Sequence, residues 1–501
     1  MFKNPFLKDL FAVQPVHPTP HVDAGEHDQG PITGEVTLKR ALTAKHLVML
    51  GIGAIIGAGI FVLTGQAAAM HAGPAVILSF VFAGIACAFA GLCYAEFASM
   101  LPVSGSAYSY SYATLGEIVA WFIGWMLILE YLFAASTVAV GWSGYFNSLL
   151  QSIGELSGMS LALPAALVNA PLTVADGHIS TTGALINLPA VLIVAAISYV
   201  CYVGVTQSAS LNAVVVAIKL VVILLFVAFS LQFVNPANWH PFVPPQDASG
   251  HFGWPGVFRA ASIVFFSYIG FDAVSTAAQE AKNPQRDMPI GILGSLVVCT
   301  ILYIIVAAVL TGIAPYTSLG TAHPVSTAVE GYPSLRWLRI VIEVGAIAGL
   351  SSVILVMLMG QPRIFYTMAK DGLVPPSFAK VHPKYQTPYV GQVIVGIIAA
   401  ILAGLLPINV LGDLVSMGTL LAFTTVCIGV YVLRKTRPDL PRAFRVPAAP
   451  VVCVLGALSC FALFAIAFKD NWKWMSCWII AGLVVYFLYG YKRSKLRGAQ
   501  R

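Results

Sequence analysis

Charged residues are scarce in this sequence. Only 9% of its 501 residues are Asp, Glu, Lys or Arg, whereas 58% are hydrophobic, and the mean hydropathy is +0.85. Soluble domains carry about 25% charged residues. The composition therefore excludes a soluble globular protein and indicates an integral membrane protein. The net charge of +7 does not require nucleic acid as a partner, and none is expected.

Cysteine pairs and catalytic motifs are also missing. None of the eight cysteines forms a Cys-x-x-Cys pair, and all lie in or beside apolar segments, so they behave as small hydrophobic residues. His17, His21 and His27 lie in a polar stretch without cysteine or carboxylate at helical spacing, so no metal site is expected. No histidine lies in the middle of an apolar segment, and no HExxH or serine-lysine motif occurs. The sequence therefore predicts neither an enzyme nor catalytic residues.

Long apolar runs, in contrast, are abundant and predict an all-α membrane protein of twelve spans. The predicted spans are residues 47–67, 74–99, 116–152, 186–203, 210–233, 255–278, 288–313, 338–368, 389–406, 410–433, 450–468 and 474–491. If the N-terminus is cytoplasmic, 21 of the 27 Lys and Arg residues fall on the cytoplasmic side. This bias predicts that both chain ends are cytoplasmic, because short cytoplasmic loops of membrane proteins are enriched in Lys and Arg.

The predicted organisation follows from these spans. Residues 1–40 are polar, rich in proline and histidine, and lack the apolar core of a signal peptide, so they predict a disordered cytoplasmic tail. Residues 41–433 predict a core of ten helices, and residues 434–449 a basic cytoplasmic connector beside lipid head groups. Residues 450–491 predict two additional helices, and residues 492–501 a cytoplasmic C-terminal tail.

Glycines are concentrated in the first predicted span, GIGAIIGAGIFVLTG. Gly51, Gly53, Gly57 and Gly59 fall within nine residues. Each glycine destabilises a helix by about 1 kcal/mol relative to alanine. Unwound backbone at membrane depth is tolerated where it lines a cavity, so a break near residues 56–59 predicts a polar ligand there. The alternative is close helix packing through small residues, and the glycines alone favour neither explanation.

Charged residues within spans are costly, so each one suggests a partner or a function. Six such residues are candidates: Glu96, Glu130, Lys219, Asp272, Glu343 and Asp413. Lys219 lies deepest, in NAVVVAIKLVVILLF, where low dielectric favours loss of its proton. Lys219 is therefore a candidate proton carrier. The alternative is a permanently charged lysine paired with a carboxylate for structural reasons.

The sixth predicted span contains a second interruption, FFSYIGFDAVST, in which Ser267 and Gly270 break an apolar run ahead of Asp272. The first and sixth spans each begin a group of five. Interrupted helices in corresponding positions of two halves point to a transporter binding site.

At this point several motifs carry a family resemblance. In order, they are GAIIGAGIFVLTG, YAEFASMLPVSGSAYSYSYATLGE with GWMLILEY, FFSYIGFDAVSTAAQEAKNPQRDMP, GQPRIFYTMAKDGLVP and RKTRPDLPRAFRVP. Together they resemble the amino acid permeases of the amino acid–polyamine–organocation (APC) superfamily, and within it the cationic amino acid transporter branch. The resemblance implies a LeuT-type fold with two inverted five-helix repeats, broken first and sixth helices and two extra helices. Twelve spans are typical of the bacterial members, which implies the inner (plasma) membrane of a bacterium.

The resemblance also implies a substrate site. The substrate carboxylate would bind backbone at Ile56, Ala58 and Gly59, and the ammonium would bind carbonyls near Ile55, Phe266, Ser267 and Ile269. Lys219 matches the lysine that replaces sodium in proton-coupled members, so a proton and no sodium is expected as the coupling ion, with no other cofactor. In that role its ammonium would bridge to carbonyls of the first span.

Three further residues bear on the substrate. Glu130 could face a cationic side chain, although a role in packing is favoured, and Asp272 is expected to stabilise a gate or helix contact. Met357 matches a position that is smaller in animal cationic transporters, which favours smaller neutral amino acids. Met126 stands where relatives of that branch commonly have aspartate, so cationic specificity does not transfer directly.

These features together predict a proton-coupled amino acid symporter that works by alternating access. An amino acid exchanger on the same fold is the alternative, and an amino acid sensor that does not transport is the alternative of another class. The expected partners are the substrate and membrane lipids. The sequence leaves open a small single-helix membrane subunit and the oligomeric state.

Overall fold

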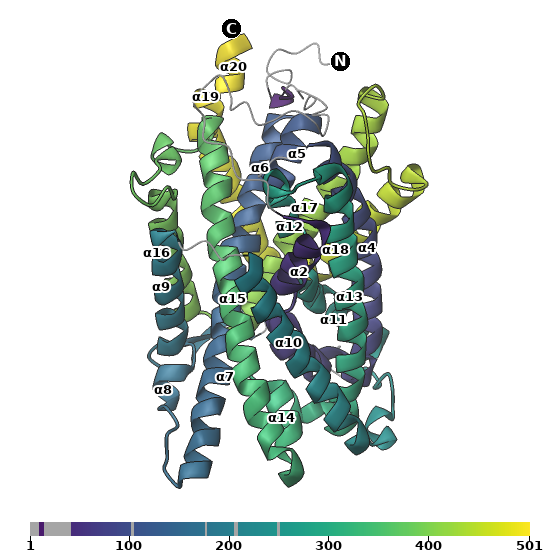
Figure 1. Cartoon of the computed structure of the whole chain (residues 1–501), viewed down its shortest axis with the longest axis vertical. Coiled ribbons are helices and arrows are strands. Elements are labelled where there is room, and N and C mark those ends of the chain that lie inside the picture. Colours follow the sequence, from purple (N-terminus) through teal and green to yellow (C-terminus); the bar gives the residue numbers. More distant parts are fainter. Residues whose placement is uncertain are drawn as a thin grey trace.

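The chain folds as a bundle of long helices (Figure 1). Its structure is a computed structural model that describes residues 10–14, 42–101, 105–175, 178–204, 209–247 and 251–500. The longer helices are α2 (Ala44–Ile55), α4 (Val76–Met100), α6 (Glu117–Ile128), α7 (Ala134–Ser157), α9 (Leu188–Val203), α10 (Ala209–Ser230), α11 (Gly253–Val264), α13 (Pro284–Ile313), α15 (Arg336–Lys370), α16 (Tyr389–Leu405), α17 (Ile408–Thr436) and α18 (Ala449–Val485). The shorter ones are α3 (Thr64–Ala67), α5 (Ser106–Thr114), α8 (Ala165–Val168), α12 (Ala273–Thr276), α14 (Pro324–Glu330), α19 (Tyr491–Arg493) and α20 (Lys495–Gln500).

The helices have the length and composition of membrane spans. Within the described residues, eight helical stretches are long and apolar enough to cross a membrane, and α9 and α16 are two shorter apolar helices. The first stretch, Ala44–Met100, contains both α2 and α4, and the last, Ala449–Arg497, is interrupted at Asn471, which has non-helical backbone angles. An all-helical membrane protein is thereby confirmed.

One hairpin departs from the purely helical prediction. Between α8 and α9, strand β1 (Leu172–Ala175) pairs antiparallel with strand β2 (His178–Thr181), with Leu172 opposite Thr181. The two residues between the strands are Asp and Gly, a pair typical of two-residue hairpin turns. This signal was present in the sequence, but the hairpin lies in a connection outside the predicted spans.

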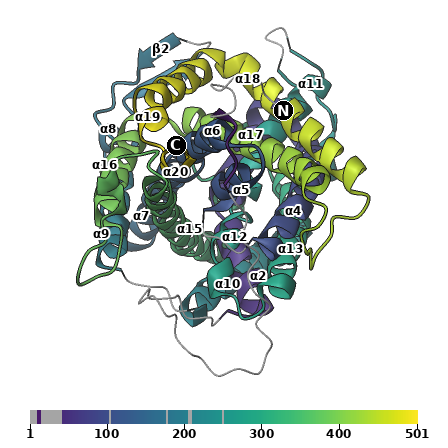
Figure 2. The same ribbon diagram turned by 90° about the horizontal axis from the view of Figure 1, so that it is seen from above.

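The interrupted first span lies among the other helices. α2 packs against α13 and α10, and α10 packs in turn against α15, which also contacts α7. Seen from above, α18 follows the outer edge of the bundle, whereas α12 and α15 lie toward its middle (Figure 2). α10, which contains Lys219, lies at the edge of the bundle and exposes Ile218 and Val221, but the side chain of Lys219 itself is buried.

Part of the N-terminal tail is packed against the bundle. Leu10 and Ala12 are buried, the Ala12 carbonyl accepts a hydrogen bond from the Glu117 amide, and the Gln14 amide donates to the Tyr112 carbonyl. Residues 10–14 therefore differ from the disorder expected for residues 1–40, and the rest of that segment lies outside the described residues. We call the end of the bundle that holds residues 10–14 and α20 the tail end (Figure 1).

The C-terminal tail is anchored at the same place through Glu117. This carboxylate is buried and accepts hydrogen bonds from Tyr112 Oη (3.1 Å), Tyr486 Oη (3.0 Å), Arg497 Nη2 (2.5 Å) and Ser494 Oγ. The first residue of α6 thus holds residues from both α5 and the chain's last helices.

Glu96, near the tail end of α4, anchors the basic connector in a similar way. Its buried carboxylate accepts from Arg434 Nε (2.9 Å) and from the Val446 amide (2.8 Å), and it lies 3.3 Å from Arg442 Nε. Two arginines that were expected to face lipid head groups therefore pair with a carboxylate inside the protein.

Replacing Glu96 with alanine should lower the thermal unfolding midpoint of the detergent-solubilised protein by several degrees. The change leaves buried Arg442 without an opposite charge, and breaking a buried ion pair costs about 3–5 kcal/mol. Asp439→Ala is the matched control because Asp439 and its partner Arg437 are both exposed, and it should leave the midpoint unchanged. Equal shifts in the two variants would contradict this account.

Candidate functional site

The first span is interrupted where its glycines are concentrated. α2 ends at Ile55, Ile56 has extended backbone angles (φ −73°, ψ 99°), and the chain bends at Gly57. Helix resumes at Ala58 and continues as a π-helical turn at Gly59–Leu63. The interruption leaves backbone groups around Ile56 without their helical partners, in a region where water is excluded.

The sixth predicted span is interrupted as well. After α11 the chain forms a 3-10 turn at Phe265–Tyr268, and then Ile269 becomes extended (φ −60°, ψ 135°). Gly270 has φ +116°, a backbone conformation that side chains with a Cβ rarely adopt. Helix resumes at α12, so the break spans residues 269–272.

The two interrupted spans cross in close contact. A Cβ atom added to Gly59 would lie 2.4 Å from the Ser267 Cα, and one added to Gly270 would lie 2.8 Å from the Ala54 carbonyl carbon. Gly51 and Gly53 instead face the side chains of Ser295 and Val216. Both explanations of the glycines therefore apply: Gly57 lies in the break, and the others allow close packing.

A tyrosine hydroxyl joins the two interruptions. Tyr303 Oη, from α13, lies 2.8 Å from the Ile55 carbonyl and 2.8 Å from the Ser267 carbonyl. A hydroxyl has one hydrogen, so it donates to one of these oxygens at a time. The two carbonyls therefore converge on one point that a hydrogen-bond donor occupies.

Lys219 lies on the other side of the first interruption. Its Nζ donates to the Gly53 carbonyl (2.7 Å) and to the Ile56 carbonyl (2.9 Å), and its side chain is fully buried. The contact that the family resemblance implied, between this lysine and carbonyls of the first span, is thus present. These carbonyls belong to the last turn of α2 and to the break itself.

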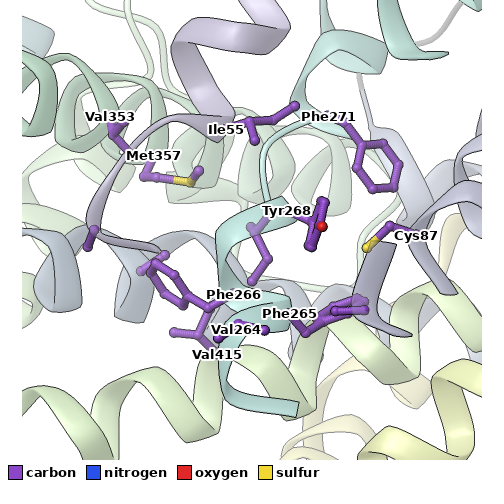
Figure 3. Close-up of a cluster of buried hydrophobic side chains, with 14 of the residues drawn as sticks. Ile55, Cys87, Val264, Phe265, Phe266, Tyr268, Phe271, Val353, Met357 and Val415 are labelled. Carbon is purple, nitrogen blue, oxygen red and sulfur yellow. The ribbon is translucent and has the colours of Figure 1, made fainter. Parts of the chain in front are cut away.

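A small cavity of about 10 Å³ lies beside the interruptions. Figure 3 shows Ile55, Phe266, Val353 and Met357 in the buried cluster around it. The lining residues are Ala54, Ile55, Gly57, Ala58, Ala134, Val138, Phe266, Ile269, Val353 and Met357. Five of the predicted substrate-binding residues are among them: Ile55, Ala58, Phe266, Ile269 and Met357. Every lining side chain is apolar, apart from Gly57, which has none.

The remaining predicted residues lie around this cavity. The Ile56 carbonyl holds Lys219, and Gly59 and Ser267 meet where the two spans cross. The Ser267 hydroxyl is buried and has no hydrogen-bond partner among the described residues. The structure thus brings the predicted backbone positions together.

The six charged residues named as candidates in the sequence analysis separate into two groups. Three carboxylates pair with arginines: Glu96 with Arg434, Glu343 with Arg339 (3.2 Å) and Asp413 with Arg259 (2.7 Å). Glu130, Lys219 and Asp272 take part in no ion pair with any residue that the structure describes, and each is at most 1% exposed. Lys219 and Asp272 bond directly to the interrupted spans. The alternative of a lysine paired with a carboxylate therefore does not describe Lys219.

Asp272 stabilises the second interruption. Its Oδ1 accepts from the Gly270 amide (3.2 Å) and its Oδ2 from Tyr131 Oη (2.9 Å). Neighbouring Glu130 is fully buried, and neither of its carboxylate oxygens has a hydrogen-bond partner among the described residues. Both side chains lie outside the lining of the cavity.

A helical membrane protein with two interrupted spans that cross at a buried site is a carrier of the kind that moves small solutes through the membrane. The comparison with known families agrees, because residues 42–488 match the model of the amino acid permease family. The chain belongs to that family, and it is therefore a transporter rather than an enzyme.

Two bacterial relatives are similar over nearly their full length, and a human relative over part of its length. The chain is 50% identical to the branched-chain amino acid permease BcaP of Bacillus subtilis (strain 168), over 93% of this chain and 96% of the relative. It is 47% identical to the methylthioribose transporter of the same organism, over 92% and 95%. It is 36% identical to cationic amino acid transporter 4 of Homo sapiens, over 82% of this chain and 62% of the relative.

Tyr303 was not predicted from the sequence, and neither were lining residues of the cavity such as Val138 and Val353. Tyr303 lies in LYIIVAAVL, a strongly apolar part of α13, where a tyrosine is easily taken for a packing residue. Its hydroxyl could have identified Tyr303 from the sequence, because a hydroxyl deep in a span needs a buried hydrogen-bond acceptor.

Removing this hydroxyl should impair transport. Tyr303→Phe leaves the Ile55 and Ser267 carbonyls without their shared donor, which costs about 1–3 kcal/mol for an unsatisfied buried group. We expect kcat/KM for amino acid uptake into proteoliposomes to fall about tenfold, since tenfold corresponds to about 1.4 kcal/mol.

Tyr268→Phe is the control, because Tyr268 Oη is also buried but bonds the Phe80 carbonyl on α4 (2.8 Å). It should reduce thermal stability to a similar extent while kcat/KM stays near the wild-type value. An equal loss of uptake in the two variants would mean that the hydroxyl of Tyr303 matters only for folding.

Proposed function

We propose that this permease is a proton-coupled amino acid symporter in which Lys219 carries the coupling proton. The observation that carries the proposal is the pair of hydrogen bonds from Lys219 to the Gly53 and Ile56 carbonyls. A protonated lysine makes charge-assisted bonds that are roughly twice as strong as neutral ones. Loss of the proton weakens the attachment of α2 to α10, and this would let the first span move during alternating access.

The proposed architecture is the LeuT-type arrangement of twelve spans. Ten form two inverted five-helix repeats that begin with the two interrupted spans, and two additional helices follow in residues 449–497. The family membership supports this arrangement, as do the positions of the breaks at residues 56–57 and 269–272. Both chain ends are proposed to face the cytoplasm of a bacterium, since the tail end holds residues from both ends of the chain and two of the relatives are from Bacillus subtilis.

The proposed substrate binds through its backbone groups. Its carboxylate would accept hydrogen bonds from the amides that open the second half of the first span. Its ammonium would donate hydrogen bonds to the carbonyls of the breaks. The Tyr303 hydroxyl can donate to only one of the Ile55 and Ser267 carbonyls at a time, so the other keeps an acceptor for an ammonium, which supports an ammonium site beside them. The proposed amides are those of Ala58 and Gly59, because the amide of Ile56, the third predicted position, already donates to the Ile52 carbonyl (2.9 Å). The carbonyls are those of Ile55, Phe266, Ser267 and Ile269.

The side chain of the proposed substrate is neutral and apolar. The cavity has room for no more than about one water molecule, so it would have to widen to admit a substrate. The side chains that line it, such as Val138, Val353 and Met357, offer no partner for a charge. Burying an unpaired charge there would cost several kcal/mol. The branched-chain permease at 50% identity is consistent with this chemistry, and branched-chain amino acids are the first substrates to test.

The identity of 47% to a methylthioribose transporter supports a second candidate substrate, a thioether sugar. Such a sugar has an apolar methylthio group but neither a carboxylate nor an ammonium. It would therefore use the cavity without the free backbone groups of the breaks. Inhibition of labelled leucine uptake by unlabelled methylthioribose separates the two candidates.

Lys219→Met should abolish coupling. Methionine keeps the length of the side chain but removes the ammonium, so the Gly53 and Ile56 carbonyls lose their donor. In proteoliposomes with an empty interior and an inward proton gradient, the wild type should accumulate labelled leucine and the variant should not. Lys469→Met, at an exposed lysine, is the control and should accumulate leucine as the wild type does.

The same assay distinguishes the alternatives. An exchanger would ignore the gradient, and its uptake would rise when amino acid is loaded inside the vesicles. A sensor would show saturable binding without accumulation. Either result in the wild type would reject proton symport, whatever the Lys219→Met variant shows.

Met357→Ala should enlarge the cavity and shift selectivity toward longer side chains. Met357 lines the cavity, and a change of a few methylene groups alters discrimination by about tenfold or more. The ratio of kcat/KM for phenylalanine to that for alanine should therefore rise about tenfold. Met359→Ala, on the same helix but outside the cavity lining, should leave the ratio within twofold, and a similar rise there would disprove the role of Met357.

A further inference from the structure

A groove lies between α9 and α16, away from the interrupted spans. These two helices pack against each other at the edge of the bundle (Figure 1). The groove has a volume of about 380 Å³, which falls within the usual range of about 300–1,000 Å³ for ligand pockets. Much of its lining is apolar, and Tyr199, Val393 and Ile397 are exposed on it.

Two polar groups in the groove have no partner. Gln392 is 3% exposed, and its Nε2 has no hydrogen-bond partner among the described residues. The Ser198 Oγ, which also lines the groove, is buried and equally unpartnered within the described chain. An unsatisfied amide in the hydrocarbon region costs several kcal/mol, so an occupant of this groove should offer an oxygen acceptor.

The polar groups lie near the tail end of both helices. Gln392 is three residues after the start of α16 at Tyr389, and Ser198 is five residues before the end of α9 at Val203. With a rise of 1.5 Å per residue, they lie roughly 5 and 8 Å from the helix ends. If the ends of α9 and α16 are taken as the membrane surface, this is the depth of the lipid ester groups.

The mouth of the groove is aromatic and positively charged. The ring of Tyr202, which lines the groove, lies 5.6 Å from that of His382 and 6.0 Å from that of Tyr385. Lys384 Nζ lies 5.4 Å from the Tyr385 ring, and Lys380 precedes it in the same loop. The sequence from 374 to 392 contains no Asp or Glu. Such a surface is complementary to an anionic head group.

We propose that this groove binds one anionic phospholipid from the leaflet at the tail end. Lys384 and Lys380 would contact its phosphate, and the Gln392 amide would donate to an ester carbonyl. An acyl chain would lie along α16 over the exposed side chains of Val393 and Ile397, which line the groove. A lipid bound between α9 and α16 would restrict the movement of α16. α16 contacts α15, the helix that contains Met357.

Native mass spectrometry of the detergent-purified full-length protein tests this proposal. Phosphatidylglycerol is titrated in competition with phosphatidylethanolamine, and bound lipids are counted. The wild type should bind one phosphatidylglycerol at least tenfold more tightly than phosphatidylethanolamine. Lys384→Gln should weaken the binding of phosphatidylglycerol about fivefold, since a basic residue near the membrane surface contributes about 1 kcal/mol.

Gln392→Leu should weaken binding by a similar factor, because it removes one hydrogen bond. Lys384 is exposed, so its variant should fold even if the buried Gln392 variant does not. Lys435→Gln is the control, since Lys435 lies over the Tyr431 ring on α17, and it should bind within twofold of the wild type. Equal affinity for the two lipids, or unchanged binding in Lys384→Gln, would overturn the proposal. So would a co-purifying single-helix polypeptide that fills the groove.

Discussion

The structure depends on how the free backbone groups of two interrupted helices are satisfied where no water is available. A break inside the hydrocarbon region exposes carbonyls whose desolvation costs several kcal/mol each, unless the protein or a ligand supplies donors. Here Lys219 supplies them to Gly53 and Ile56, and Tyr303 supplies one to Ile55 and Ser267. The positions of α10 and α13 follow from this requirement, because each contributes one of these side chains to the break.

The same requirement separates structural charges from functional ones. Carboxylates such as Glu96 and Glu343 have arginine partners: Glu96 pairs with Arg434 of another helix, and Glu343 pairs with Arg339 one turn away on α15. Among the residues that the structure describes, Lys219 has only carbonyl partners, so a change in its protonation alters the strength of those bonds without leaving an opposite charge unpaired. This difference makes Lys219 better suited than the paired residues to couple a proton to a movement.

Much of this arrangement could be predicted from the sequence, because local composition determines it. The glycines around Gly57 and Gly270 mark the breaks, and the lack of charge marks the spans. The partners of buried side chains could not be predicted, since Glu96 and Arg434 are 338 residues apart and only the packing of the helices brings them together. The role of Tyr303 was not predicted for the same reason, because the carbonyls that accept its hydrogen bond lie on two other spans. The packed residues 10–14 were also missed, because a few apolar residues give no periodic pattern to detect.

The most direct test of the central claim is to measure proton movement that the substrate itself drives. Wild-type protein is reconstituted into vesicles that contain a pH-sensitive dye, with equal pH on both sides, and leucine is added outside. Coupled transport predicts acidification of the interior that saturates with leucine and is absent in Lys219→Met. Leucine entry without acidification in the wild type would contradict the account, because the bond between Lys219 and the broken helix would then have no part in coupling.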